Sequence, residues 1–315
     1  MTNAGRPAGP SRDPTWPGAS ADLPSVATIE ALGLAVSLYL PTLMDERPDP
    51  RAPHGPPLVD ARFDVPDHLV EADGRLGTGL LAALVDNVGG MATGLAVLPD
   101  WIVTTNLTLR RPVPPLDLDG GSGGEGPLSI EAGVLRRGRS TVVSEVAITG
   151  PDGSTVATAL MTSSILTPEQ GPPPVPRPLR RRPVPTVDDP LYQCAPEVFF
   201  ALEPGRRPGE METEAPPRLR NPWGIVHGGA LAVIVDAAAR AAVAHPTGID
   251  TDPGALRVTD VVLHYLSPGR VGPVVARAEL VGQRGDDHLV RVIVRDRGAD
   301  DRLLVLSALT VRTRR

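Results

Sequence analysis

Two adjacent glycines and one acid in the second half of the chain have the residue types for chemistry on a carbonyl group. Gly228 and Gly229 precede the apolar run Ala230–Val243, which is typical of a core helix. The first turn of a helix carries free N–H donors and a partial positive charge, and glycines leave those donors unshielded. Such a turn can stabilise a developing oxyanion. Asp236 lies inside the same apolar run, where a carboxylate needs a partner or a function.

The spacing between these groups excludes a site built from one helix. Gly228 and Asp236 are eight residues apart, which is roughly 12 Å along a helix axis. One reacting carbonyl cannot contact both groups. If the donors and an acid serve one reaction centre, the acid must come from a second copy of the motif.

The first half of the chain contains such a copy. The segment Asp73–Asn87 aligns with the later motif and places Asp86 under Asp236, an offset of 236 − 86 = 150 residues, with Gly77 under His227. Shorter matches follow downstream, between Thr105–Leu109 and Thr259–Leu263 and between Arg137–Arg139 and Arg284–Asp286. A repeat of this length is far longer than a solenoid unit and implies a duplicated domain.

Each copy has the same order of expected elements, which predicts an α+β fold in which an antiparallel sheet wraps a long central helix. The helices are expected at about 77–97 and about 228–245. An N-terminal strand should precede each of them, at Leu58–Val65 and at Val198–Leu202. Period-2 alternation and β-branched runs predict the other strands, at about 102–110, 128–136, 140–149, 154–166, 256–266, 273–283, 287–296 and 302–313.

The motif of the second half resembles that of a known enzyme family. It reads Asn-x-x-Gly-x-x-His-Gly-Gly with an Asp nine residues after the His, carried by Asn221, Gly224, His227, Gly228, Gly229 and Asp236. This pattern resembles the hotdog-fold thioesterases of the phenylacetate-pathway (PaaI-like) type. The resemblance implies that two hotdog units pair side by side with active sites at their interface, here within one chain as a double hotdog.

Composition divides the chain into four expected segments. Residues 1–24 are expected to be a disordered tail, and residues 25–169 form the first unit, with an N-terminal helix within Val26–Leu43. A linker rich in Pro and Arg follows at 170–190, and residues 191–315 form the second unit.

The resemblance and the spacing together assign the catalytic residues. The second unit should supply Asn221 to orient water or carbonyl, His227 to shape the loop, and the Gly228 N–H to polarise the thioester carbonyl. The first unit should supply Asp86 as general base or nucleophile, and Thr104, whose position in the related thioesterases helps to hold the attacking water.

The reverse pairing would use Asp236 with the loop Gly74–Gly79. There Gly77 replaces the histidine, and Val258 takes the position of the hydroxyl. One competent and one degenerate site are therefore expected in each chain, and Asp236 by itself can be read as a structural acid.

Arginines could hold the phosphates of coenzyme A, which enters only as part of the substrate, because no cofactor is expected. The candidates are Arg136, Arg137 and Arg139, with Arg110 and Arg111 as a second group. The alternative is that they are solvated charges of turns and strands.

Composition excludes several other functions. The net charge is −6, which does not suggest nucleic-acid binding, and all 31 basic residues are Arg, so neither a Schiff-base Lys nor a P-loop Lys is present. The single Cys excludes an internal disulfide, and the His spacing suggests no metal site. No signal peptide or membrane span is evident, so a cytoplasmic protein is expected, and two double-hotdog chains could pair as a homodimer.

Two other functions remain open. The half-degenerate motif would also fit a non-catalytic acyl-CoA-binding or regulatory protein on the same fold. An enoyl-CoA hydratase would need a His with a nearby acid or amide on a different loop pattern, which is not found.

Overall fold

The structure is a computed structural model of the 315-residue chain. It describes residues 25–313, apart from 53–54, 72–73, 113–125, 170, 173–174, 176, 182–186 and 248–254. The predicted tail at 1–24 and part of the linker at 170–190 lie outside the described residues.

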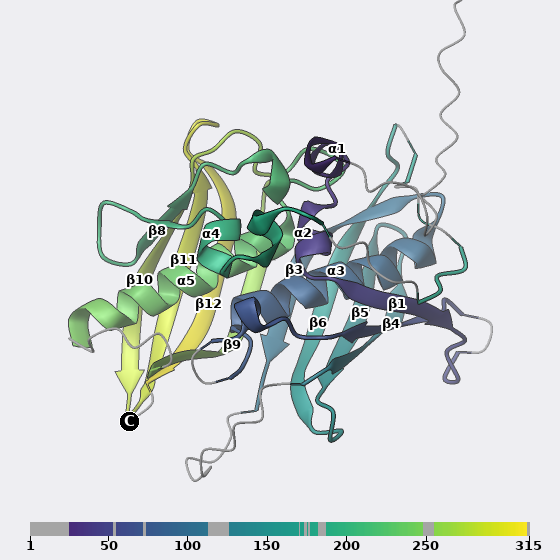
Figure 1. Cartoon of the computed structure of the whole chain (residues 1–315), viewed down its shortest axis with the longest axis horizontal. Helices are drawn as coiled ribbons and strands as arrows, with labels where there is room; N and C mark the ends of the chain where they lie inside the picture. Colours follow the sequence, from purple (N-terminus) through teal and green to yellow (C-terminus); the bar gives the residue numbers. More distant parts are fainter. Residues whose placement is uncertain are drawn as a thin grey trace, which may run out of the picture.

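A single antiparallel sheet of 12 strands runs through both halves of the chain (Figure 1). Its order is β1-β2-β4-β5-β6-β3-β9-β12-β11-β10-β8-β7. The first half contributes β1 (Thr42–Arg47), β2 (Leu58–Phe63), β3 (Trp101–Arg110), β4 (Leu128–Arg137), β5 (Thr141–Thr149) and β6 (Thr155–Leu166). The second half contributes β7 (Glu203–Pro204), β8 (Glu210–Thr213), β9 (Leu256–Tyr265), β10 (Val274–Arg284), β11 (Asp287–Asp296) and β12 (Arg302–Thr313).

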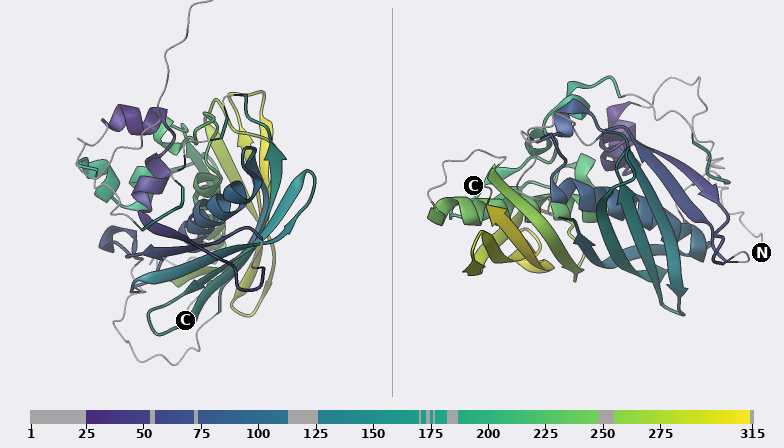
Figure 2. Two further views of the ribbon diagram at one scale, coloured as in Figure 1. Left: turned by 90° about the vertical axis from the view of Figure 1, so that its right-hand side faces the viewer. Right: turned by 90° about the horizontal axis from the view of Figure 1, so that it is seen from below.

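Two long helices lie side by side on one face of this sheet (Figure 2). They are α3 (Thr78–Val97) and α5 (Gly228–Thr247), and both are apolar around most of their circumference. Such helices are stable only when they are enclosed, and α3 is buried along most of its length between the sheet and α5. The α+β class, the two helices and the eight strands predicted from alternation are confirmed.

The halves meet through a strand pair with local two-fold symmetry. In the antiparallel pairing of β3 with β9, Thr108 lies opposite Val262. Two residues to either side, Asn106 pairs with His264 and Arg110 pairs with Asp260. Each half therefore presents the same edge strand to the other, and the sheet continues across the junction without an exposed edge.

Glycines let the two helices approach closely near their N-termini. A Cβ on Gly79 would lie 2.9 Å from Val233 Cα, and one on Gly229 would lie 2.9 Å from Ala83 Cα. Both distances are too short for a real side chain. The contact brings the start of each helix against the middle of the other helix.

Short helices cover the side of α3 and α5 that faces away from the sheet (Figures 1 and 2). The N-terminal ones are α1 (Val26–Ala31) and α2 (Ala35–Tyr39), and both lie within the segment Val26–Leu43 where a helix was predicted. The last two residues of that segment belong instead to the start of β1, since β1 begins at Thr42.

The strand predicted at Val198–Leu202 is wrong. This segment is the end of α4 (Pro196–Phe199) and a turn, where Ala201 has φ 50°. Three single turns of 3-10 helix complete the set, at Asp67–Leu69, Pro190–Gln193 and Pro217–Leu219.

Aromatic packing explains the failed strand. Phe199 stacks on Tyr39 of α2, with 3.7 Å between ring centroids and 5° between ring planes. Tyr39 also donates its hydroxyl hydrogen to the Cys194 carbonyl at 2.8 Å. The apolar residues that suggested a strand therefore face the N-terminal helices.

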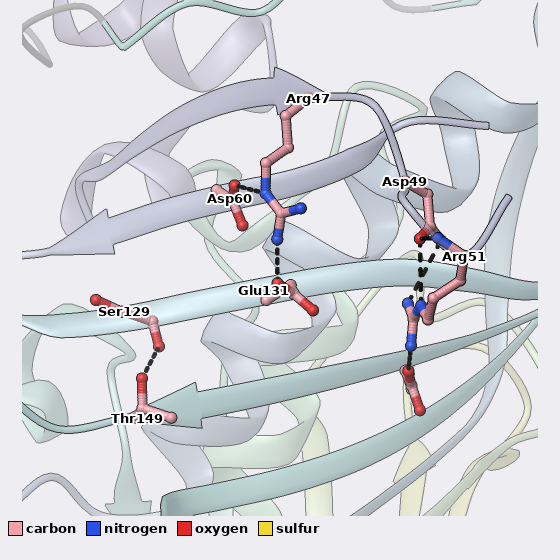
Figure 3. Close-up of polar contacts among 8 residues, drawn as sticks. Arg47, Asp49, Arg51, Asp60, Ser129, Glu131 and Thr149 are labelled. Carbon is pink, nitrogen blue, oxygen red and sulfur yellow. Dashed lines mark hydrogen bonds and ion pairs between the residues drawn. The ribbon is translucent and has the colours of Figure 1, made fainter. Parts of the chain in front are cut away.

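Ion pairs fasten the outermost strands of the first half (Figure 3). Arg47 on β1 pairs with Asp60 on β2 and with Glu131 on β4. Arg51 binds Asp49 and also reaches Glu145, at 2.6 Å. Asp49 is buried and Asp60 is half-buried, but each pair contains an arginine that is at least 40% exposed, so each contributes little stability. Charges on an edge strand also discourage pairing with another chain.

By length and composition, α3 could also cross a membrane. It is the one such helix in the described part of the chain, and 72% of its apolar window is buried inside the protein. Its burial is that of a core helix.

Candidate active site

Asp86, in the middle of α3, lies against the start of α5. Its Oδ2 accepts a hydrogen bond from the Gly229 N–H at 3.0 Å. A Cβ on Gly228 would lie 2.8 Å from the same oxygen, so only a glycine fits there. Asp86 thus caps the first turn of α5 from the other half of the chain, in the position that an N-cap side chain usually takes.

The neighbouring Gly228 N–H is a free donor. Gly228 is the first residue of α5, and its N–H donates to no acceptor within the described residues. It lies next to the Asp86 carboxylate and at the positive end of the helix dipole. An N–H in this position can bind a carbonyl oxygen beside the acid.

Thr104 on β3 holds the other oxygen of the acid. Its hydroxyl donates to Asp86 Oδ1 at 2.8 Å. The strand carries a bulge between Thr104 and Asn106, which changes the direction of side chains along the strand. Each carboxylate oxygen has two lone pairs, so Asp86 can still accept a proton from a third partner.

We predict that Thr104→Val lowers kcat/KM of the reaction that Asp86 serves about 10- to 100-fold, since a hydrogen bond to a charged group is worth about 1.5–3 kcal/mol. The variant keeps the shape of the side chain but loses its hydroxyl. Thr104→Ser keeps the hydroxyl and should remain within about threefold of the wild type. Equal rates for the valine and serine variants would show that the hydroxyl does not position Asp86.

His227 is buried beside the acid. Its Nδ1 is 3.0 Å from the Gly229 nitrogen and 3.4 Å from Asp86 Oδ2. Burial lowers the pKa of His227 below its ordinary value, and the Asp86 charge opposes this shift only in part. The ring is therefore neutral, and Nδ1 shares the Gly229 N–H with the carboxylate, a role in shaping the helix start.

A pH dependence of stability follows from that shift. The unfolded chain takes up the proton of His227 near pH 6.5, whereas the folded chain, with its lowered pKa, does so only at lower pH. The contribution of neutral His227 is therefore complete above about pH 6.5 and is lost as pH falls, by at most about 1.4 kcal/mol per pH unit.

Melting temperatures measured between pH 8 and pH 5 test this prediction. His227→Gln should lose less stability than the wild type as the pH falls, while His264→Gln, which changes an exposed histidine, should behave as the wild type does. Half-buried His68 has a pKa that desolvation lowers as well, so the difference between variants is the informative quantity. Parallel curves for the wild type and His227→Gln would contradict the prediction.

The loop before α5 is held by Asn221. Its Oδ1 accepts hydrogen bonds from the N–H groups of Trp223 at 3.0 Å and Ile225 at 3.3 Å. Gly224 lies between them with φ 69°. The side-chain oxygen of Asn221 therefore forms the loop, and its Nδ2 group is the part that could orient a water or a carbonyl.

Tyr265 is a further residue of this site, which the sequence analysis missed. Its hydroxyl donates to the Gly228 carbonyl at 3.1 Å, from the end of β9. Burial, and secondly the charge of Asp86, raises the pKa of Tyr265 well above its ordinary value. Tyr265 therefore stays protonated and holds the peptide between Gly228 and Gly229, whose N–H donates to Asp86. Its place at the end of a predicted strand gave no signal of this role.

Asp236 lies apart from this group, in an ion-paired cluster. Its Oδ2 is 2.8 Å from Arg240 Nη2, and Arg240 Nη1 is 2.9 Å from Glu71 Oε1. Burial raises the pKa of Glu71, and the Arg240 charge counteracts that shift. Glu71 precedes Asn221 by 150 residues, so the offset of the repeat could have identified it.

The loops before the two helices have the same backbone structure. The N–H of Gly74 donates to Glu71 at 2.9 Å, and that of Gly224 donates to Asn221 at 2.9 Å. Short bridges close both loops, between Val70 and Leu76 and between Arg220 and Val226. The repeat inferred from sequence therefore extends to the loops, although their side chains differ.

The candidate phosphate-binding arginines come from the end of β3 and from the β4–β5 turn. Arg136, Arg137 and Arg139 are exposed around the β4–β5 turn, and Arg137 donates to the Ala96 carbonyl near the end of α3 at 2.9 Å. Arg110 lines a depression of about 320 Å³ together with Glu131 and Glu145. Since Leu109 is buried on the helix side, strand alternation puts Arg110 on the opposite face.

Arg111 is buried and binds the first turn of α3. It donates to the Leu76 carbonyl at 2.9 Å and contacts the Thr78 hydroxyl at 3.3 Å. This interior position makes it a structural residue rather than part of a phosphate site.

Part of the second half of the chain matches a known protein family. Residues 224–301 match the thioesterase superfamily. This segment includes His227, Gly228 and Asp236. Among curated proteins, none matches the sequence.

Solved structures, among them thioesterases, share the fold. A proposed oleoyl thioesterase from Lactobacillus plantarum has a TM-score of 0.56 at 13% identity, with 81% of this chain and 96% of that chain covered. The tesB protein of Mycobacterium avium subspecies paratuberculosis gives 0.51 at 13%, covering 90% and 99%. A 12:0-ACP thioesterase from Umbellularia californica gives 0.51 at 9%, covering 81% and 94%. At these identities the likeness establishes the hotdog fold alone.

Proposed function

We propose that the protein is an acyl-CoA thioesterase of the PaaI-like type, a double hotdog with one composite active site between its units. The observation that carries this proposal is the hydrogen bond at 3.0 Å from the Gly229 N–H to Asp86. It joins an acid of one unit to the helix start of the other. This arrangement removes the difficulty of an acid about 12 Å from the donors of its own helix.

The thioester carbonyl binds at the start of α5. Its oxygen accepts a hydrogen bond from the free N–H of Gly228. Tyr265 fixes the position of Gly228 by donating a hydrogen bond to the carbonyl of the same residue. The negative charge that develops on this oxygen is stabilised by the N–H and by the helix dipole. The donor is fixed before the reaction, so no reorganisation is needed.

Asp86 supplies the attack on the carbonyl carbon. It takes a proton from water, and the oxygen of that water forms the new C–O bond while the carbonyl electrons move to the bound oxygen. When the carbonyl re-forms, the C–S bond breaks and the electron pair leaves with sulfur. The proton held by Asp86 then passes to the thiolate, which gives a free acid and CoA. Direct attack by Asp86, through an anhydride that water then cleaves, gives the same products.

The second pairing has no such place for a substrate. Arg240 lies between Asp236 and Glu71, and Gly77 stands where the first site has His227. We therefore assign turnover to Asp86 alone, with Asp236 in a structural role.

A panel of acyl-CoA thioesters tests the function, with released thiol followed by a thiol-reactive dye. Thiol release that depends on Asp86 supports the proposal. Binding of the same compounds without thiol release would indicate a non-catalytic acyl-CoA-binding protein. A loss of enoyl absorbance without thiol release would indicate a hydratase.

We also propose that two chains associate through the outer face of the sheet. Leu160 on β6 and Leu306 on β12 are exposed there by 50% and 38%. Sedimentation of the purified protein as a monomer at micromolar concentration would contradict this association.

A further inference from the structure

The two units differ at the residue one turn after the acid. Gly90 follows Asp86 by four residues, and Arg240 follows Asp236 by four residues. The offset of 150 that relates the acids therefore also relates Gly90 to Arg240. Residues four apart lie on one face of a helix, so each is the neighbour of its acid toward the helix C-terminus.

In the second unit, the side chain at this position occupies the space in front of the acid. Arg240 reaches back to Asp236 at 2.8 Å and across to Glu71, in the loop of the other unit, at 2.9 Å. Glu71 is the counterpart of Asn221, and the two loops share their backbone hydrogen bonds. A side chain at residue 90 would therefore extend between Asp86 and Asn221.

In the first unit, that space is open. A Cβ on Gly90 would have no atom within 4 Å. The neighbouring glycines of α3 are tightly packed instead: a Cβ on Gly89 would lie 2.5 Å from Met161, and one on Gly94 would lie 2.5 Å from Trp101. The opening is thus local to the turn of α3 that follows Asp86.

An apolar cluster lies farther along the same helix. Trp101 packs with Val97, Ile102 and Val142, separately from the main core. Trp223, from the loop before α5, joins them with its ring centroid 6.4 Å from that of Trp101. None of these side chains is charged. A hydrocarbon chain would gain apolar contacts there, whereas the amides of a pantetheine arm would be left without partners.

We propose that Gly90 determines the acyl specificity of the site: an aliphatic acyl group passes from the carbonyl over Gly90 toward the Trp101–Trp223 cluster. Arg240 closes the equivalent path in the second unit, which leaves the chain with one open site. The inference rests on the proposed thioesterase function. Asp86 and Gly94, on which Trp101 packs, are eight residues apart, roughly 12 Å along the helix, and this span sets the length of acyl chain that the path would hold.

Substitutions of Gly90 test the proposal against acetyl-, hexanoyl- and decanoyl-CoA and the corresponding N-acetylcysteamine thioesters. Gly90→Leu should lower kcat/KM at least 30-fold more for the decanoyl substrates than for the acetyl substrates, with either thiol. Gly90→Arg should abolish turnover of every substrate by pairing with Asp86, as Arg240 pairs with Asp236. Both residues favour a helix more than glycine does, so melting temperatures should not fall.

Gly282→Leu is the matched control, because Gly282 on β10 also has no atom within 4 Å of an added Cβ. It should leave all rates unchanged. If wild-type enzyme turns over the panel and Gly90→Leu affects all acyl lengths equally or not at all, this inference fails and the thioesterase assignment stands. Losses confined to the CoA thioesters would assign the opening to the pantetheine arm and also overturn it. If the wild type hydrolyses none of the compounds, the proposed function fails, and the inference fails with it.

Discussion

Asp86→Asn is expected to lower kcat for acyl-CoA hydrolysis by about 10²- to 10⁴-fold, the contribution that a positioned general base typically makes. Asparagine has the shape of aspartate, and its oxygen can still accept a hydrogen bond from Thr104 or Gly229. It can neither take a proton from water at neutral pH nor attack as a carboxylate. The folded structure should therefore survive while turnover is lost.

Asp236→Asn is the matched control for this prediction. It changes the equivalent acid of the second unit, whose Oδ2 pairs with Arg240. Turnover at a temperature well below melting should stay within about threefold of the wild type, since no substrate group contacts it in the proposed mechanism. If Asp236→Asn abolished turnover and Asp86→Asn spared it, the assignment of the two sites would be reversed.

Arg240→Met is expected to lower the free energy of unfolding by about 3–5 kcal/mol, the usual cost of removing one partner from a buried ion pair. Arg240 is 23% exposed, and its partners Glu71 and Asp236 are 19% and 7% exposed. Without it, two carboxylates would share a largely buried site with less compensating charge. Denaturant unfolding at pH 7.5 measures the effect.

Arg291→Met gives the comparison, because Arg291 pairs with Glu279 on the surface, where the two side chains are 52% and 64% exposed. Its cost should not exceed about 1 kcal/mol. Adding Glu71→Gln to Arg240→Met should recover part of the lost stability by removing one of the unpaired charges. Equal costs for Arg240→Met and Arg291→Met would show that the buried cluster is not a structural element.

The sequence was most informative where one physical pattern repeats. Strand alternation located β4, β5, β11 and β12 to within a residue or two, because one face of each strand is buried under a helix. The apolar runs located α3 and α5, since a helix without a polar face must be enclosed. The eight-residue spacing from Gly228 to Asp236, with the repeat of 150 residues, predicts Asp86 as the acid of the site.

Tertiary contacts determine the structure of the segment before α5, where the sequence pattern suggested a different element. The apolar residues Val198–Leu202 suggested a strand, but stacking of Phe199 on Tyr39 fixes them in a short helix and a turn. The strand that pairs with β10 in this region is Glu210–Thr213, a short segment that is mostly polar.

The sequence also did not show that Arg240 fills the second site. Arg240 follows Asp236 by four residues on an apolar helix, and only the fold shows that it also reaches Glu71, 169 residues away in the sequence. Tyr265 acts on the site through the backbone of Gly228, a contact that no motif describes.

A crystal structure of the Asp86→Asn protein with intact decanoyl-CoA is the most direct test that the two units share one site. The account predicts that the thioester oxygen accepts the Gly228 N–H and that the carbonyl carbon lies beside residue 86. A thioester bound at the start of α3, beside Thr78 and Asp236, would contradict it. So would a thioester bound far from the start of both long helices.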